Sequence, residues 1–204
     1  MKLYEKVFYF ISGHGRGWAF SSSDLIKKFD RQQIDSTLSD LTKNKKIRRI
    51  ARGIYDYPKY SDFLQKELSP DIDQVARAYA RKFNWRIEVS GDSALNLLNL
   101  STQIQAKYIY LSDGPNKSYK IVDNIILEFK KSSLKDIGFK YRESSLIVQS
   151  LKALGKEHVT SKTIHKIKEQ VHPKMYEKIL KDTQSTTGWV YETIKQICKE
   201  DIDE

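Results

Sequence analysis

The chain has 204 residues, of which 39% are hydrophobic and 30% are charged, with 36 Lys and Arg against 26 Asp and Glu. This length and composition exclude a large multidomain enzyme and a disordered chain, and the formal net charge of +10 favours a polyanionic partner. Cys198 has no second cysteine to pair with, and the N-terminal apolar stretch is too short and too interrupted by charge for a signal peptide or membrane span. We therefore expect a globular cytoplasmic protein that does not contact membranes.

Residues 1–60 carry most of the excess charge, with 13 basic and 6 acidic side chains. Periodicity in this region predicts a first helix that ends at Ser12-Gly13, and a short second helix over residues 24–29. Asp30 is placed to cap a third helix, with Gln33 at the capping-box position. The apolar stripe of this third helix consists of Ile34, Leu38 and Leu41.

The face of the third helix opposite this stripe is polar. At 100° per residue it contains Gln32, Ser36, Ser39 and Lys43, with Gln33 beside them. An α-helix fits the major groove of DNA, where Gln and Ser side chains can bond to base edges. The pattern is therefore typical of a recognition helix.

A basic segment follows at residues 43–52, where six of ten residues are Lys or Arg and none is acidic. β-branched and aromatic residues around Gly53 predict a two-stranded hairpin, closed by Pro58. Helices followed by a basic hairpin have the order of a winged helix-turn-helix, which we predict over residues 1–59. The predicted contacts with double-stranded DNA are Ser22, Arg31, Gln32, Gln33, Ser36, Lys43, Lys45, Lys46, Arg48, Arg49 and Arg52. Solvated surface or a protein-docking module is the alternative.

Residues 60–204 predict a second domain, which makes the whole chain an α+β protein with a C-terminal α/β domain. Its predicted features are a small sheet and a helical tail. The predicted elements are a helix starting at Ser69-Pro70-Asp71, a strand at 86–89, a helix at 94–100 capped by Ser90, strands at 107–111, 117–122 and 125–130, and helices at 144–154, 161–171, 173–182 and 188–200.

Several motifs in this order resemble the AbiEi-type antitoxins of type IV toxin-antitoxin systems, which act in bacterial abortive infection. The motifs are Ile50-Ala51-Arg52-Gly53-Ile54-Tyr55, Ser69-Pro70, Val89-Ser90-Gly91-Asp92-Ser93-Ala94-Leu95-Asn96-Leu97-Leu98 and Leu100-Ser101-Thr102-Gln103. The resemblance implies a winged helix that binds inverted repeats in the operon's own promoter and represses it. It also implies a C-terminal domain that counters a nucleotidyltransferase-like toxin without a stable complex. We expect no enzymatic activity and no cofactor.

Two other functions remain open on the residues. Asp113, Glu128 and Lys130 have a spacing like that of restriction-type nucleases, in which two carboxylates hold Mg²⁺ and a lysine stabilises developing charge. An ordinary turn and a half-exposed strand account for the same residues, and we favour that interpretation. The other alternative is a plain transcription regulator with a ligand-binding or dimerisation domain.

Two further residue sets have structural interpretations. His158, His165 and His172 recur every seven residues, which is about 10.5 Å along a helix and too far for shared metal coordination. Tyrosines and lysines on the predicted strands could stack on and neutralise single-stranded RNA, but we expect packing. The residues are Tyr108, Tyr110, Tyr119, Tyr141, Lys107, Lys117 and Lys120. Cys198 is expected to be a small buried hydrophobic side chain.

Overall fold

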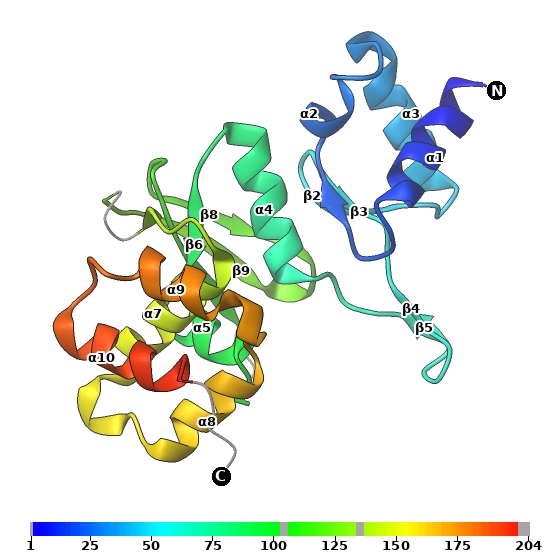
Figure 1. The fold of residues 1–204 in the computed structure, drawn as a ribbon. Helices are drawn as coiled ribbons and strands as arrows, with labels where there is room; N and C mark the ends of the chain where they lie inside the picture. Colours follow the sequence, from blue (N-terminus) through cyan, green and yellow to red (C-terminus); the bar gives the residue numbers. More distant parts are fainter. Residues whose placement is uncertain (1, 103–105, 134–136, 200–204) are drawn as a thin grey trace. The chain divides into compact units, whose positions relative to one another are not determined.

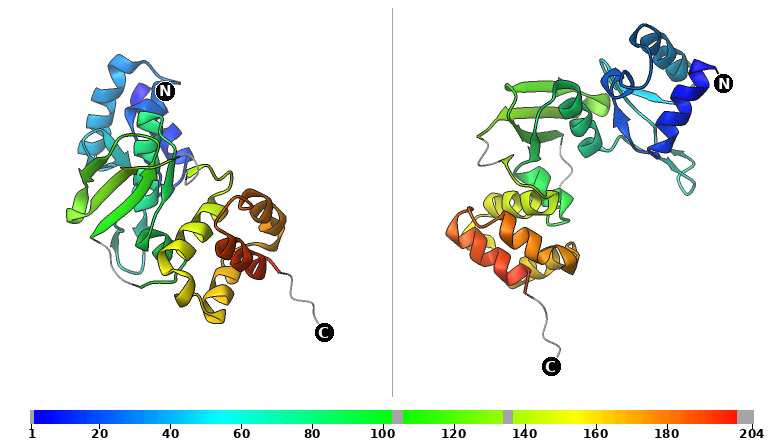
Figure 2. Two further views of the ribbon diagram at one scale, coloured as in Figure 1. Left: turned by 90° about the vertical axis from the view of Figure 1, so that its left-hand side faces the viewer. Right: turned by 45° about the horizontal axis from the view of Figure 1, so that its top comes forward.

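The computed structural model describes residues 2–102, 106–133 and 137–199 and has a mixed α+β fold, which confirms the predicted class. The chain forms two compact units, shown in Figures 1 and 2. The first comprises the residues up to 86 together with 118–127. The second comprises residues 87–117 and those from 128 onward.

The first unit begins with three helices and a small sheet. Its elements are α1 (Leu3–Gly13), β1 (Ala19–Phe20), α2 (Ser22–Leu25), α3 (Arg31–Lys43), β2 (Arg48–Ala51), β3 (Ile54–Asp56), β4 (Tyr60–Ser61), β5 (Lys66–Glu67) and α4 (Ile72–Phe83). Figure 1 shows α1, α2 and α3 gathered next to the β2–β3 hairpin. The three predicted helices and the predicted hairpin are therefore present, although α2 begins two residues earlier and ends four residues earlier than expected.

The sheet of this region has the strand order β1-β3-β2, and both pairings are antiparallel. Ala51 pairs with Ile54, which leaves Arg52 and Gly53 as a two-residue turn. Gly53 has a φ of 72°, a backbone conformation that glycine adopts without steric cost. The hairpin therefore presents Arg52 at its tip.

Local hydrogen bonds explain where the helices begin. The Ser21 N–H donates to the Asp24 carboxylate at 2.9 Å, so α2 starts directly after Ser21. Asp30 caps α3 as predicted, because its carboxylate accepts a hydrogen bond from the Gln32 N–H at 3.0 Å. The predicted capping box with Gln33 is wrong for the described residues, since the Gln33 N–H bonds to the Asp30 carbonyl instead.

The core of the N-terminal helices is a single apolar cluster. It consists of Val7, Ile11, Phe20, Leu25, Ile34, Leu38, Leu41 and Ile47, all at most 2% exposed. Fully burying each such side chain stabilises the fold by about 1.5–3 kcal/mol. The predicted stripe of α3 is thus confirmed as its buried face, and this fixes which face of α3 is left to solvent.

Helix α4 belongs to the first unit, which consequently extends beyond the predicted domain boundary at residues 59 and 60. Arg81 explains the attachment: its Nε donates to the Asp24 carboxylate and its Nη2 to the Ala19 carbonyl, each at 2.7 Å. Phe83, the last residue of α4, is 41% exposed and stacks on Trp85.

The second unit holds most of the remaining elements. The remaining elements are β6 (Ile87–Val89), α5 (Asp92–Leu97), β7 (Lys107–Ser112), β8 (Lys117–Lys120), β9 (Ile126–Lys131), α7 (Arg142–Leu154), α8 (Ser161–Glu169), α9 (Tyr176–Asp182), α10 (Gly188–Ile197) and the 3-10 helices η1 (Val122–Asn124), η2 (Lys156–His158) and η3 (Pro173–Met175). Of these, η1 lies in the first unit. The sheet order is β6-β7-β9-β8, and β8 and β9 are each divided between the units. Figure 2 shows helices α7 to α10 gathered together.

Residues 144–151 of α7 are all buried, which makes this helix the centre of the C-terminal helical group. The predicted Ser90 cap is wrong, because Gly91 is the N-cap of α5 with a φ of 56°. Gln103 and Glu200, both part of the predictions, lie outside the described residues. Within the described ranges, none of the helices combines the length and apolar character that crossing a membrane requires.

Candidate nucleic-acid interface

The solvent-facing side of α3 carries the predicted recognition residues. Gln32, Gln33, Ser36, Ser39 and Lys43 are all exposed, and we call them the polar face of α3. The Ser36 hydroxyl donates to the Gln33 carbonyl at 3.0 Å, so its proton is used within the helix while its lone pairs remain acceptors. The structure therefore presents amide and hydroxyl groups on a rigid helix.

The cations after α3 form a second exposed group. Lys43, Lys45, Lys46, Arg49 and Arg52 are all exposed, and we call them the cationic strip. Among the described residues none of the five forms an ion pair with a carboxylate. Lys45 and Arg49 also line a surface hollow of about 560 Å³, together with Thr42, Ile47, Arg48 and Glu67. Unpaired cations on an exposed surface are available to phosphate groups.

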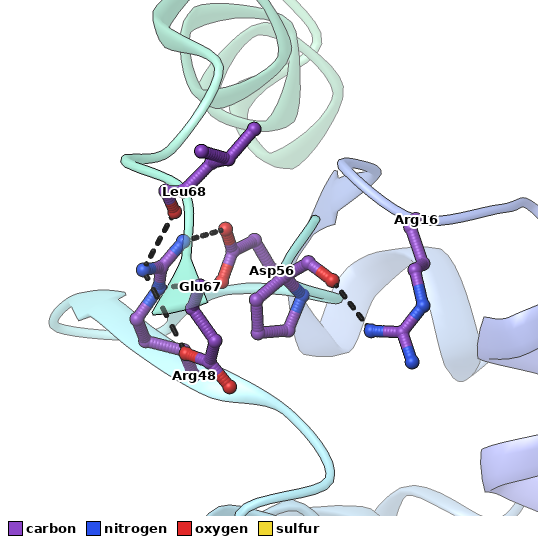
Figure 3. A network of polar contacts seen from close by, with 6 residues as sticks. Arg16, Arg48, Asp56, Glu67 and Leu68 are labelled. Carbon is purple, nitrogen blue, oxygen red and sulfur yellow. Dashed lines mark hydrogen bonds and ion pairs between the residues drawn. The ribbon is translucent and has the colours of Figure 1, made fainter. Parts of the chain in front are cut away.

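Arg48 differs from its neighbours, as Figure 3 shows. Its guanidinium donates to both carboxylate oxygens of Asp56, at 3.1 and 2.7 Å, and to the Leu68 carbonyl at 3.1 Å. Glu67 lies 3.9 Å from the same guanidinium. Arg48 was predicted as a phosphate contact, but its donors are already occupied, and its position joins the hairpin to the segment after β5.

Burial of the Arg48–Asp56 ion pair changes the pKa of Asp56. The Asp56 side chain is 2% exposed and that of Arg48 is 24% exposed. Burial raises the pKa of Asp56, and the hydrogen bond and charge of Arg48 oppose this without reversing it. Arg16 reinforces the same segment by donating to the Pro58 carbonyl at 2.9 Å, also visible in Figure 3. These two arginines therefore link residues that are 20 and 42 positions apart in the chain.

Ser22 and Arg31 complete the predicted contact set. Ser22 is half-buried in the first turn of α2, whereas Arg31 is exposed as the first residue of α3. Arg31 is thus placed beside Gln32 at the helix end that would enter a groove. Ser22 is the less accessible of the two.

Sequence reasoning missed one cation in this region. Lys82, on the last turn of α4, has its ammonium beside the β2–β3 turn: a Cβ placed on Gly53 would lie 2.9 Å from Lys82 Nζ. The two residues are 29 positions apart, so no local pattern indicates their proximity. The sequence shows only that Lys82 follows Arg81 on the polar side of a predicted helix.

The two carboxylates of the nuclease alternative do not come together. Glu128 forms an ion pair with Lys107, the first residue of β7, whereas Asp113 follows the last residue of that strand. Six residues of extended strand place Asp113 about 20 Å from Lys107, so the carboxylate that is paired with Lys107 is not positioned to share a metal ion with Asp113. Within the described part of the chain, no three His, Cys, Asp or Glu side chains are grouped to hold a metal.

The tyrosines and histidines considered in the sequence analysis differ in burial. Tyr110 is buried beside Phe129, and Tyr119 stacks on Tyr79 with ring centroids 4.1 Å apart. His158, His165 and His172 are exposed and lie on η2, on α8 and before η3. Cys198 is 6% exposed, which confirms its predicted burial, and burial raises the pKa of its thiol to about 11.

Comparison with curated proteins found no relative of this chain. Residues 6–180 match the model of a family described as a family of unknown function (DUF6088). The matched segment includes parts of both compact units and spans most of the chain. The chain therefore belongs to this family.

Proposed function

We propose that the chain binds double-stranded promoter DNA through a winged helix-turn-helix formed by residues 1–59. The observation that carries the proposal is the succession of the polar face of α3 and the cationic strip, both exposed and without carboxylate partners within the described residues. The chain order α1, β1, α2, α3, β2 and β3, with the sheet order β1-β3-β2, supports the same assignment.

In this proposal the two surfaces have different roles. The polar face of α3 enters the major groove, where Gln32 and Gln33 can each offer a donor and an acceptor to a base edge. Arg49, Arg52 and the lysines contact phosphates, which gives affinity and salt dependence but carries no sequence information. Arg48 is left out of the contact set because Asp56 and Leu68 already bind its guanidinium.

For the biological role, the proposal rests on the resemblance of the sequence motifs to AbiEi-type antitoxins. We propose that the chain represses its own toxin-antitoxin operon and that its C-terminal region counters a nucleotidyltransferase-like toxin without a stable complex. No catalytic role is proposed for Asp113, Glu128 and Lys130, because Glu128 is paired with Lys107 at the far end of β7 from Asp113.

A binding assay on the promoter upstream of the gene tests the DNA-binding proposal. The variant Arg49→Ala with Arg52→Ala should bind more weakly and have a shallower dependence on salt, by about 0.9 in log-log slope for each phosphate that the variant no longer neutralises. Its matched control is Lys162→Ala with Lys166→Ala, which removes the same charge from exposed positions on α8. Equal weakening in both double variants would show a general effect of net charge and would contradict the proposal.

A second experiment separates an antitoxin from a plain transcription regulator. Co-expression with the adjacent toxin gene should restore growth for an antitoxin. A regulator without antitoxin activity should bind the promoter but leave the toxin's effect on growth unchanged when the toxin is expressed from an unrelated promoter.

A further inference from the structure

Helix α4 places a lysine at the hairpin turn by means of the arginine that precedes it. Arg81 is held by the Asp24 carboxylate and the Ala19 carbonyl, and its guanidinium carbon lies 5.9 Å from the centre of the Trp18 ring. These contacts fix the last turn of α4 against the N-terminal elements. Lys82, the next residue, is thereby directed to a defined place.

That place is the β2–β3 turn. The Lys82 ammonium lies so close to Gly53 that a Cβ there would be 2.9 Å away. Its other contact is with the ring of Phe83, whose centre is 5.5 Å from Nζ. Gly53 therefore has two reasons to be glycine: its positive φ, and the space that the ammonium occupies.

Arg52 brings a second positive charge to the same turn. Burial lowers the pKa of Lys82, and the nearby charge of Arg52 lowers it further. In the described residues neither Arg52 nor Lys82 has a carboxylate partner. Two like charges held together without a counter-ion repel each other, and an anion bound to both would remove that cost.

We propose that Arg52 and Lys82 together bind one phosphate group of the DNA backbone. This inference rests on the proposed function and extends its interface beyond residue 59 to a helix outside the predicted winged helix-turn-helix. Arginine offers a planar pair of donors and lysine a compact charge, a combination suited to the two free oxygens of a phosphodiester. DNA is favoured as the source because Arg52 is already part of the cationic strip.

The test uses the full chain with Lys82→Gln, Arg52→Gln and both changes, on promoter DNA and on DNA of unrelated sequence. Each single variant should lose affinity for promoter DNA and for unrelated DNA by the same factor, because a phosphate contact does not read sequence. The double variant should lower the log-log salt slope by about 0.9 in total, because the two cations share one phosphate. Lys82→Arg should retain binding, and Lys162→Gln on α8 serves as the control for removal of a lysine.

If Lys82→Gln binds DNA with the affinity and salt slope of the wild type while Arg49→Ala binds more weakly, the inference is wrong. The proposed function would not be affected by that result. A double variant whose slope falls by twice the expected amount would also overturn it, since two separate phosphates would then be involved. Thermal unfolding in inorganic phosphate adds an arm that does not depend on DNA. One outcome is that inorganic phosphate raises the unfolding temperature of the wild type but not of Lys82→Gln, while neither protein binds DNA. That result would support an anion site but would contradict both DNA as the source of the phosphate and the proposed function.

Discussion

The cationic strip differs from four lysines of the second unit in what surrounds it. Lys107 pairs with Glu128, Lys195 pairs with Glu192, and Lys140 and Lys178 both lie over the ring of Tyr141. The cationic strip, by contrast, forms no ion pair with the described carboxylates, although Lys46 lies over the ring of Phe8. Net charge alone therefore does not locate a polyanion interface, because some cations are already neutralised by a neighbouring carboxylate.

Arg48 and Arg49 show the same contrast between adjacent residues. In the β2–β3 pairing Arg48 faces Asp56, whereas Arg49 faces Tyr55 and is exposed. Successive side chains of a strand point to opposite faces, so one arginine is turned to a buried carboxylate and the other to solvent. Substitutions at these two positions should consequently separate stability from DNA binding.

The largest effect is expected for Arg48→Ala. This substitution leaves the Asp56 carboxylate buried without the guanidinium that pairs with it. The free energy of unfolding should fall by about 2–4 kcal/mol. This value is toward the lower part of the range for broken buried ion pairs, because the Arg48 side chain is 24% exposed. Urea unfolding followed by circular dichroism measures this. Arg48→Leu combined with Asp56→Leu should recover much of the stability, whereas an unchanged unfolding free energy for Arg48→Ala would refute the anchoring role.

The next largest effect concerns sequence reading by α3. Gln32→Ala should cost about 1–3 kcal/mol of binding free energy on the promoter and little on random DNA. Ser36→Ala should cost less, because the Ser36 hydroxyl donates to the Gln33 carbonyl and has only its acceptor capacity left. Competition binding at fixed salt provides the measurement. An unchanged ratio of specific to random binding in both variants would favour a protein-docking role for this helix.

Arg49→Ala should have the opposite profile to Arg48→Ala. We expect its unfolding free energy to stay within about 0.5 kcal/mol of wild type, as for most exposed positions. Its log-log salt slope for DNA binding should fall by about 0.9, the contribution of one phosphate contact. If Arg49→Ala destabilises the fold as much as Arg48→Ala while leaving the slope unchanged, the distinction between the two arginines fails.

The smallest effect is a pH dependence of stability at Asp56. Because its pKa in the folded protein is raised above 3.8, the folded state binds the proton more readily than the unfolded state. The stability of wild type relative to Asp56→Asn should therefore be highest below pH 3.8 and decline as pH rises through the folded-state pKa. Urea unfolding of both proteins across this range is the check, and a relative gain for wild type with rising pH would contradict it.

The sequence by itself determined the local elements of this protein. Ile34, Leu38 and Leu41 recur at helical spacing, and Asp30 precedes them at a capping position, so α3 and its buried face were predictable. The hairpin was predictable because Gly53 allows a turn that the flanking residues do not. Such features depend on interactions between residues a few positions apart, which a single sequence displays directly.

Tertiary structure alone decided which polar groups are available. Leu68 lies 20 residues from the arginine that donates to it, and Asp24 lies 57 residues from Arg81. The same long-range packing brings Lys82 to Gly53 and keeps Asp113 away from Glu128. No local periodicity encodes these distances, because they follow from how separate helices and strands bury their apolar faces against one another. The sequence therefore indicated where the charges are, and the fold determined which of them remain unpaired.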